Sequence, residues 1–266
     1  PRALVDRGVR ARDERERRGH DLVAGLDAHR AQREVQAGRA AGHGRGVRHA
    51  EALGAVHRDG TAVGARGHPA AFGFYANKQL TTGEGGLIAL ADADAKERID
   101  SERNQGRAPD MGWLDHDRLG FNYRLTDIAC AIGLAQLDRL DDMLAARARV
   151  AGWYRELLAD VEGLELPYPD TDGDVRGWFV FVVQLPRGID RDDTVRALRE
   201  RGVQSKPYLP AIHLMSFYRE RFGHRPGEFP VCEDVAARSL ALPFFPALTQ
   251  GQAERVAAAL RAVLDR

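Results

Sequence analysis

Two short apolar runs, separated by a polar turn, dominate the hydrophobic pattern around residues 72–90. The first run is aromatic, spans residues 72–76 and predicts a buried strand, which Lys78 follows. Next come Thr81–Gly86, a turn rich in hydroxyls and glycine, and Leu87–Leu90, the second apolar run. A lysine at the end of a strand, beside glycines that let a ligand approach the backbone, is well placed for covalent chemistry.

Helical patterns follow at two places. Residues 92–106 predict a polar helix that ends in a loop, and Ser101–Arg107 is interpreted as a surface loop because it is charged and lacks periodicity. Apolar residues recur at helical spacing from Asp127 to Leu158, which predicts one long helix. Thr126 or Asp127 can cap its first turn.

The last part of the chain predicts a compact α/β unit. Its expected elements are a strand at Trp178–Leu185, a helix at Arg191–Arg201, an extended stretch at Val203–Pro210, a helix at Val231–Ser239, a strand at Leu240–Phe245 and a helix at Thr249–Leu264. Gly202 is placed to end the first helix, and Thr249 with Gln252 resembles a capping box that opens the last. His213 lies in a loop or short helix, and its apolar context is typical of a structural histidine.

Residues 1–48 differ from the rest in composition. They contain 12 arginines but no Lys, Ile, Phe, Tyr, Trp, Met or Cys, and their apolar residues are too sparse for a core-facing stripe. A solvated helix face, disorder, or out-of-frame translation of a GC-rich gene would each explain them. Interspersed acids and missing aromatics disfavour a nucleic-acid-binding arm. The character changes near Ala50, and His57–Thr61 carries the Asp-Gly signal of a tight turn.

The overall composition limits the classes of protein. The 266 residues suffice for one large domain or two smaller ones, and the net charge of zero predicts no general attraction to nucleic acid or membrane. No apolar run reaches the roughly 20 residues that span a bilayer. Cys130 and Cys232 are expected to be reduced core residues, which fits a cytoplasmic protein. The chain starts at Pro1, without Met or a signal peptide, which is consistent with a fragment.

Lysine is scarce in this chain. Of the 39 Lys and Arg residues only Lys78, Lys96 and Lys206 are lysine. A chain that uses Arg for nearly all its cations has a reason to keep a Lys, because only an amine forms a Schiff base. A surface lysine that caps the strand is the alternative. Asn122 and Arg124 precede the long predicted helix, where an anion is favoured, although such residues more often serve capping and solvation.

Four ordered motifs carry a family resemblance. They are Phe74–Gly86, Gly120–Asp127 with Ala131–Leu137, Ser205–His213, and Leu242–Phe245. Together they resemble the DegT/StrS family of pyridoxal-phosphate-dependent sugar aminotransferases, which have fold type I. Four matches in order are far more specific than any one of them.

The resemblance implies an α/β fold with an incomplete fold type I large domain and a small C-terminal α/β domain. Residues 1–48 would be an irregular, atypical segment. Residues 49–150 would be the remnant of the cofactor-binding domain with its long helix, and residues 151–266 the small domain.

The resemblance also implies roles for individual residues. Lys78 would form the internal aldimine with pyridoxal phosphate and then move the proton between Cα and C4′. Glu51 matches a position near the cofactor ring. Asn122 matches an asparagine that reaches the cofactor phosphate of the neighbouring subunit, which implies a homodimer with shared active sites. Arg124 and His213 match positions on the substrate side, and no metal site is predicted.

Three positions or regions depart from the family pattern. Arg48 lies where the family has an aspartate that pairs with the pyridine nitrogen, and a cation there would weaken the electron sink. Residues 1–48 supply neither the family's phosphate-binding loop nor its stacking aromatic. Gly73 replaces a serine that binds the phosphate. The first two departures meet at the change of composition, which favours a frameshift or truncation over a natural divergent N-terminus.

The implied activity is transfer of an amino group from glutamate or glutamine to the keto carbon of a nucleotide-linked sugar, in polysaccharide or antibiotic biosynthesis. The alternative is a catalytically impaired relative that binds a sugar nucleotide or a partner without turnover. The intact Lys78 motif favours the enzyme, whereas Arg48 favours the alternative.

Overall fold

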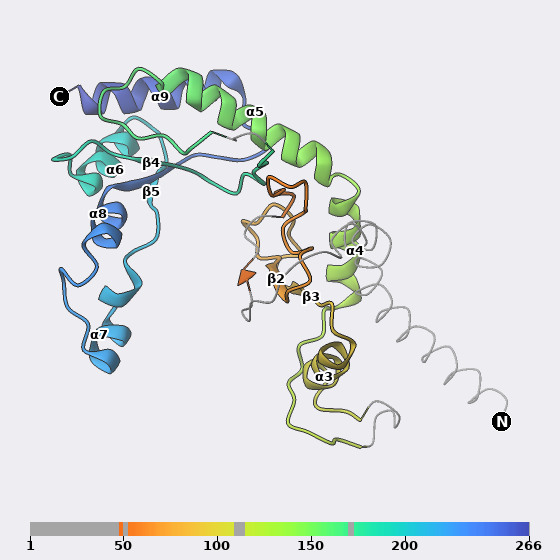
Figure 1. The fold of residues 1–266 in the computed structure, drawn as a ribbon. Coiled ribbons are helices and arrows are strands. Elements are labelled where there is room, and N and C mark those ends of the chain that lie inside the picture. Colours follow the sequence, from red (N-terminus) through yellow and green to blue (C-terminus); the bar gives the residue numbers. More distant parts are fainter. Residues whose placement is uncertain (1–47, 50–52, 109–114, 170–172, 266) are drawn as a thin grey trace. The chain divides into compact units, whose positions relative to one another are not determined.

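A computed structural model describes residues 48–49, 53–108, 115–169 and 173–265, with Arg48 and His49 described by their backbone (Figure 1). The chain divides into two compact units. The first comprises Pro1–Asp141 with Asp170–Gly177, and the second comprises Asp142–Pro169 with Trp178–Arg266. The domain limits expected from the sequence stay predictions. Glu51 and nearly all of residues 1–48 lie outside the described residues.

The first unit contains a three-stranded sheet of β1 (Arg48–His49), β2 (Ala70–Gly73) and β3 (Gly86–Ala89), in that order. β2 runs parallel to β1 and antiparallel to β3, with Phe72 opposite Leu87. The two apolar runs are therefore neighbouring strands. The first was expected to be a buried strand, but of residues 72–76 only Phe74 is buried, and Tyr75 is 53% exposed. β2 ends before the expected position, because the backbone turns back where the Lys78 N–H donates to the Tyr75 carbonyl at 3.0 Å.

The helices of the first unit begin at capping side chains. α3 (Ala93–Arg103) begins after Asp92, whose carboxylate accepts from two backbone N–H groups. α4 (Asp127–Leu137) begins after Thr126, whose hydroxyl accepts from the Ala129 N–H at 3.2 Å. Of the two capping candidates, Thr126 is the one used.

The prediction of one long helix was wrong. α4 ends at Leu137, and α5 (Leu140–Leu158) begins three residues later. The Arg139 N–H donates to the Gln136 carbonyl at 3.1 Å, so the last turn tightens to an i→i+3 bond. Continuous apolar periodicity does not reveal such a break, because the register of the pattern hardly changes over one turn.

The second unit has a sheet in the order β4 (Phe181–Gln184), β6 (Ser239–Leu242) and β5 (Lys206–Pro207), with both pairs antiparallel. Its other elements are α6 (Arg191–Glu200), η2 (Ile212–Leu214), α7 (Ser216–Phe222), α8 (Pro230–Arg238) and α9 (Gln250–Leu264). The predicted capping box of Thr249 and Gln252 is confirmed. The predicted strands and helices of this part are all present, with shifted ends.

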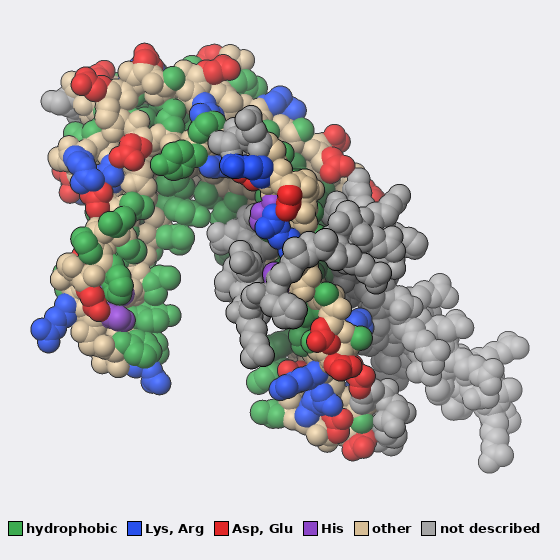
Figure 2. All heavy atoms as spheres, viewed as in Figure 1, with side chains coloured by type: hydrophobic (Ala, Val, Ile, Leu, Met, Phe, Trp, Pro, Cys, Tyr) green, Lys and Arg blue, Asp and Glu red, His purple; other side chains and the backbone are tan. Residues whose placement is uncertain are grey.

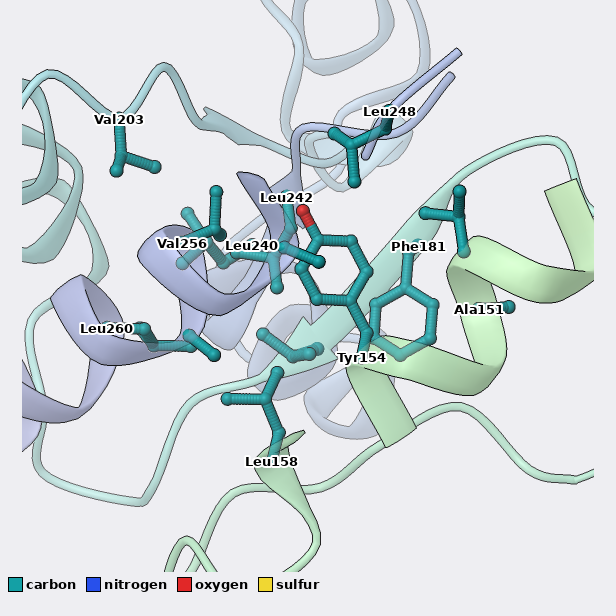
Figure 3. Close-up of a cluster of buried hydrophobic side chains, with 14 of the residues drawn as sticks. Ala151, Tyr154, Leu158, Phe181, Val203, Leu240, Leu242, Leu248, Val256 and Leu260 are labelled. Carbon is teal, nitrogen blue, oxygen red and sulfur yellow. The ribbon is translucent and has the colours of Figure 1, made fainter. Parts of the chain in front are cut away.

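The core of the second unit joins α5, β4, α6, β6 and α9 (Figure 3). Tyr154 and Phe181 are fully buried at its centre, with ring centroids 5.0 Å apart. The Tyr154 hydroxyl donates to the Pro243 carbonyl at 2.7 Å, so its polar end is satisfied. Burial raises the pKa of this phenol above its ordinary range.

Both cysteines are free thiols, as expected. Cys130 is buried in α4, but Cys232 is exposed in α8, so the expectation that both belong to the core was wrong for Cys232. None of the helices in the described ranges combines the length and apolar character needed to cross a lipid bilayer.

Candidate active site

Lys78 lies in a turn that links β2 to β3. The two limbs of the turn pair beyond the strands, because the Phe74 N–H donates to the Gly85 carbonyl at 2.8 Å and the Thr82 N–H donates to the Phe74 carbonyl at 3.0 Å. The half-buried lysine stem passes close to the glycine that ends β2: a Cβ added at Gly73 would lie 3.8 Å from Lys78 Cε. A side chain at this position would come into ordinary van der Waals contact with the stem of Lys78.

Two threonine hydroxyls stiffen this turn. Thr81 Oγ1 donates to the Phe74 carbonyl at 3.0 Å and accepts from the Gly83 N–H at 2.9 Å. Thr82 Oγ1 donates to the Glu84 carbonyl at 2.6 Å. A phosphate group needs donors, and both hydroxyl protons are already given to carbonyls. The threonines therefore shape the turn rather than present a phosphate cradle.

The turn is also tied to α4. The Thr81 N–H donates to Gln136 Oε1 at 3.1 Å, and Gln136 Nε2 donates to the Thr81 carbonyl at 2.7 Å. This pair satisfies both backbone groups of Thr81 with one side chain. Sequence reasoning missed Gln136, because nothing local distinguishes it from a solvated helix residue.

Asn122 and Arg124 lie on an exposed segment just before α4. Asn122 forms an isolated antiparallel bridge with Asn104, which caps the end of α3. Arg124 Nη1 donates to Asn104 Oδ1 at 2.7 Å and to Gln105 Oε1 at 3.4 Å, a longer contact. The expected surface loop at 101–107 is in fact the support of this segment, and Ser101 in it is 4% exposed.

His213 belongs to the second unit, in η2. Its side chain is 9% exposed, and its Nε2 lies 3.0 Å from Glu233 Oε1 of α8. Its ring packs edge-on against Phe229, with centroids 4.8 Å apart. Hydrogen bonds from the Gly227 N–H and from His213 hold the pKa of Glu233 below its ordinary range. Glu233 was not singled out from the sequence.

Glu51 lies outside the described residues, so its expected place near the cofactor ring stays a prediction. Arg48 is described only as backbone, in β1 opposite Ala70. That Arg48 replaces the family's aspartate, which pairs with the pyridine nitrogen, therefore rests on the sequence and not on a side-chain position in the structure. Among the candidate residues, the structure brings Asn122 and Arg124 together on one segment of the first unit, the unit that also holds Lys78.

Pyridoxal phosphate fits the Lys78 turn in one clear respect. The lysine stem extends from a braced backbone and passes beside Gly73, a position without a side chain, and a primary amine is the group that binds an aldehyde. The two threonines of the turn do not serve as phosphate donors. Phosphate binding would then fall to other groups, of which the resemblance implies Asn122 of a neighbouring subunit.

Comparison with known proteins agrees with the motifs. The sequence model of the DegT/DnrJ/EryC1/StrS aminotransferase family matches residues 49–261. The chain therefore belongs to this family, whose enzymes are sugar aminotransferases that use pyridoxal phosphate.

Individual relatives show how far the match extends. The chain is 38% identical over 218 residues to GDP-perosamine synthase of Caulobacter vibrioides, covering 81% of this chain and 57% of that protein. It is 37% identical over 217 residues to the erythromycin biosynthesis sensory transduction protein EryC1 of Saccharopolyspora erythraea, covering 80% of this chain and 56% of that protein. The crystal structure of S. venezuelae DesV, in complex with a ketimine intermediate, superposes with a TM-score of 0.73 at 32% identity, covering 82% and 57%. The chain thus spans little more than half the length of these relatives.

Proposed function

We propose that this chain carries the catalytic lysine and the small domain of an aminotransferase that moves an amino group from glutamate or glutamine to the keto carbon of a nucleotide-linked sugar. The observation that carries the proposal is the braced turn around Lys78, within a chain of this family. Relatives named for perosamine and erythromycin synthesis support a sugar as the acceptor.

Lys78 holds the cofactor and then moves a proton. Its Nζ would hold pyridoxal phosphate at the aldehyde, and the amine of Lys78 would take up the proton that leaves Cα of the amino donor and hand it on. The cofactor supplies the electron sink, whereas the protein supplies orientation and electrostatics. A backbone held on both sides of the lysine keeps Nζ within reach of both carbons, as such a proton transfer requires.

The remaining roles belong to the same proposal. Glu51 lies near the cofactor ring, Asn122 binds the cofactor phosphate of a neighbouring subunit, and Arg124 and His213 contact the substrates. The working form is then a homodimer with shared active sites. Action in the cytoplasm likewise stays a prediction.

Borohydride reduction tests the proposal directly. The full chain is incubated with pyridoxal phosphate, reduced, digested and mapped by mass spectrometry. Because the chain has only three lysines, Lys96 and Lys206 serve as internal controls for non-specific labelling. Lys96 is exposed and paired with Asp100 at 2.5 Å. We expect the label at Lys78 in preference to both.

The outcomes separate the two candidate functions. Selective labelling of Lys78 followed by amino transfer supports the enzyme. Labelling of all three lysines alike would sink cofactor binding at this site, and nucleotide-sugar binding without labelling would favour the catalytically impaired relative. A Lys78→Ala variant provides the blank for the mapped peptide.

A further inference from the structure

The end of α3 and the segment before α4 form a small backbone ladder. The Phe121 N–H donates to the Glu102 carbonyl at 2.6 Å, the Tyr123 N–H to the Arg103 carbonyl at 2.8 Å, and the Gln105 N–H to the Phe121 carbonyl at 2.8 Å. These bonds alternate between the two segments. The backbone around Arg124 is therefore fixed by residues that lie about twenty positions earlier in the chain.

Two glycines allow this close approach. A Cβ added at Gly106 would lie 1.8 Å from the Arg118 carbonyl oxygen, and one added at Gly120 would lie 2.1 Å from the Gly106 nitrogen. Neither position tolerates a side chain without moving the backbone. Next to them, Gln105 has a φ of 69°, a conformation that non-glycine residues seldom adopt. Such strain persists only where surrounding contacts impose it.

The strained position places an amide on Arg124. Asn104 Oδ1 accepts from Arg124 Nη1 at 2.7 Å, and Gln105 Oε1 lies 3.4 Å from the same nitrogen and also accepts from Arg107 Nη2 at 3.3 Å. No carboxylate in the described part of the chain pairs with this guanidinium. Many other arginines here do have one: Arg98 pairs with Glu102, Arg118 with Asp117, and Arg187 with Asp234.

The chemistry of the acceptors determines what Arg124 can do. A carboxylate would orient the guanidinium but also neutralise it, whereas an amide oxygen orients it and leaves its full charge. The planar fork of an arginine binds carboxylates and phosphates through two parallel N–H groups. Nη1 of Arg124 is held by the amides, and among the described residues no other hydrogen-bond acceptor occupies its remaining N–H groups.

We propose that Asn104 and Gln105 are positioning residues that hold Arg124 in a charged, oriented state to bind an oxyanion of a substrate. The oxyanion is a phosphate of the nucleotide-linked sugar or a carboxylate of the amino donor. The inference rests on the proposed function for its choice of substrates. The amide contacts that support it are independent of Lys78.

The test compares Asn104→Asp with Arg124→Gln in the full chain with pyridoxal phosphate. Calorimetric titration measures the Kd of inorganic pyrophosphate in one arm and of L-glutamate in the other. The carboxylate introduced by Asn104→Asp would keep the hydrogen bond and offset the charge of Arg124. We therefore expect about a tenfold weaker Kd for one of the two probes in each single variant, typical of one lost charge-assisted contact.

The double variant and a distant control make the result decisive. If Asn104 acts through Arg124, the double variant binds no more weakly than Arg124→Gln alone. Arg98→Gln, which removes the exposed pair with Glu102 on α3, should leave both Kd values unchanged. The probe whose Kd shifts identifies the source of the oxyanion.

A merely structural role for Asn104 predicts that Asn104→Asp binds like the wild type, and this result would overturn the proposal. Binding of neither probe by the wild type, or an additive double variant, would also overturn it. Borohydride labelling of Lys78 is recorded on the same samples. If Lys78 is labelled but the variants change the Kd of neither pyrophosphate nor L-glutamate, this inference alone is refuted. If Lys78 is not labelled but the variants do weaken one Kd, only the proposed function is refuted.

Discussion

At Lys78 the backbone contacts decide where the side chain can go. The Phe74 carbonyl accepts from both the N–H of Thr82 and the hydroxyl of Thr81, so the limb after the lysine is bound to the limb before it. Gln136 then holds Thr81 from α4. These bonds fix the Cα of Lys78, whose side chain has four rotatable bonds, and so reduce the volume that Nζ explores.

Gly85 is the residue of this turn that should tolerate substitution least. Its φ is 144°, and an added Cβ would lie 2.7 Å from both Leu125 Cδ1 and Thr82 Oγ1. We expect Gly85→Ala to lower the free energy of unfolding by about 1–3 kcal/mol, because backbone strain and a steric clash add. Urea unfolding followed by circular dichroism measures the change.

Gly83→Ala is the matched control for that prediction. Gly83 also has a positive φ, of 84°, but an added Cβ would meet nothing within 4 Å. Its substitution should show backbone strain alone, on the order of 1 kcal/mol. Equal losses in the two variants would mean that the contact with Leu125 and Thr82 contributes nothing.

Among the elements, the link from α7 to α8 is organised by one carboxylate. Glu233 accepts from the Gly227 N–H at 2.8 Å, from the Phe229 N–H at 3.2 Å and from His213. One side chain in the first turn of α8 thus fixes both the turn before that helix and the imidazole proposed to contact substrate. Figure 2 shows hydrophobic side chains gathered around this part of the surface, and Phe217 and Phe222 of α7 are 61% and 58% exposed.

Glu233 should make this region sensitive to acid. The pKa of the carboxyl is lower in the folded chain than in the unfolded one, because backbone N–H groups and His213 stabilise the anion. Its stabilising contribution is therefore present at neutral pH and is lost as the pH falls through and below about 4.3, the ordinary value for Glu. Glu233→Gln should be less stable than wild type at pH 7, and the difference should shrink on acidification.

Urea unfolding at several pH values from neutral to acid checks this expectation. The titratable groups close to Glu233 are His213 of η2, which pairs with it, and the neighbouring His224, which pairs with Glu228. Protonation of both histidines therefore also contributes to the pH dependence of the unfolding curves. Glu254→Gln, at an exposed glutamate of α9, is the control. A stability difference between Glu233→Gln and wild type that stays constant with pH would contradict the assignment.

At the scale of the whole molecule, the chain corresponds to only part of the length of its relatives. Residues 49–261 belong to one aminotransferase family, yet they cover only 57% of a relative such as GDP-perosamine synthase of Caulobacter vibrioides.

Shared active sites can be tested by mixing variants. If Lys78 and Asn122 serve one site from opposite subunits, Lys78→Ala and Asn122→Ala are each inactive, and their mixed dimer has one complete site. An equal mixture should regain about a quarter of wild-type amino transfer, because half of the dimers are mixed and each has one site of two. Sedimentation should give twice the 29.3 kDa of one chain.

Mixing Lys78→Ala with Lys78→Arg is the matched control, since no arrangement of these two restores a lysine. A mixture of Lys78→Ala and Asn122→Ala that stays inactive, with active wild type, would show that both residues serve the same subunit's site. A monomeric mass would remove shared sites altogether.

The sequence by itself determined the features that depend on near neighbours. Thr249 opens α9 with the expected capping box, and Thr126 was one of the two expected caps of α4, because a short hydroxyl reaches N–H groups three residues on. Four short motifs in order also identified the family, because the residues of each motif are nearly contiguous in the chain.

Only the tertiary structure decided which distant residues meet. Asn104 and Gln105 hold Arg124 across about twenty positions, Glu233 holds His213 across a similar separation, and Gln136 holds Thr81 across a longer one. Such contacts leave no local signal, because amides and carboxylates on a helix or loop look the same in sequence whether they meet water or a partner. The break between α4 and α5 escaped for a related reason: one tightened turn alters the path of the backbone without altering the apolar periodicity.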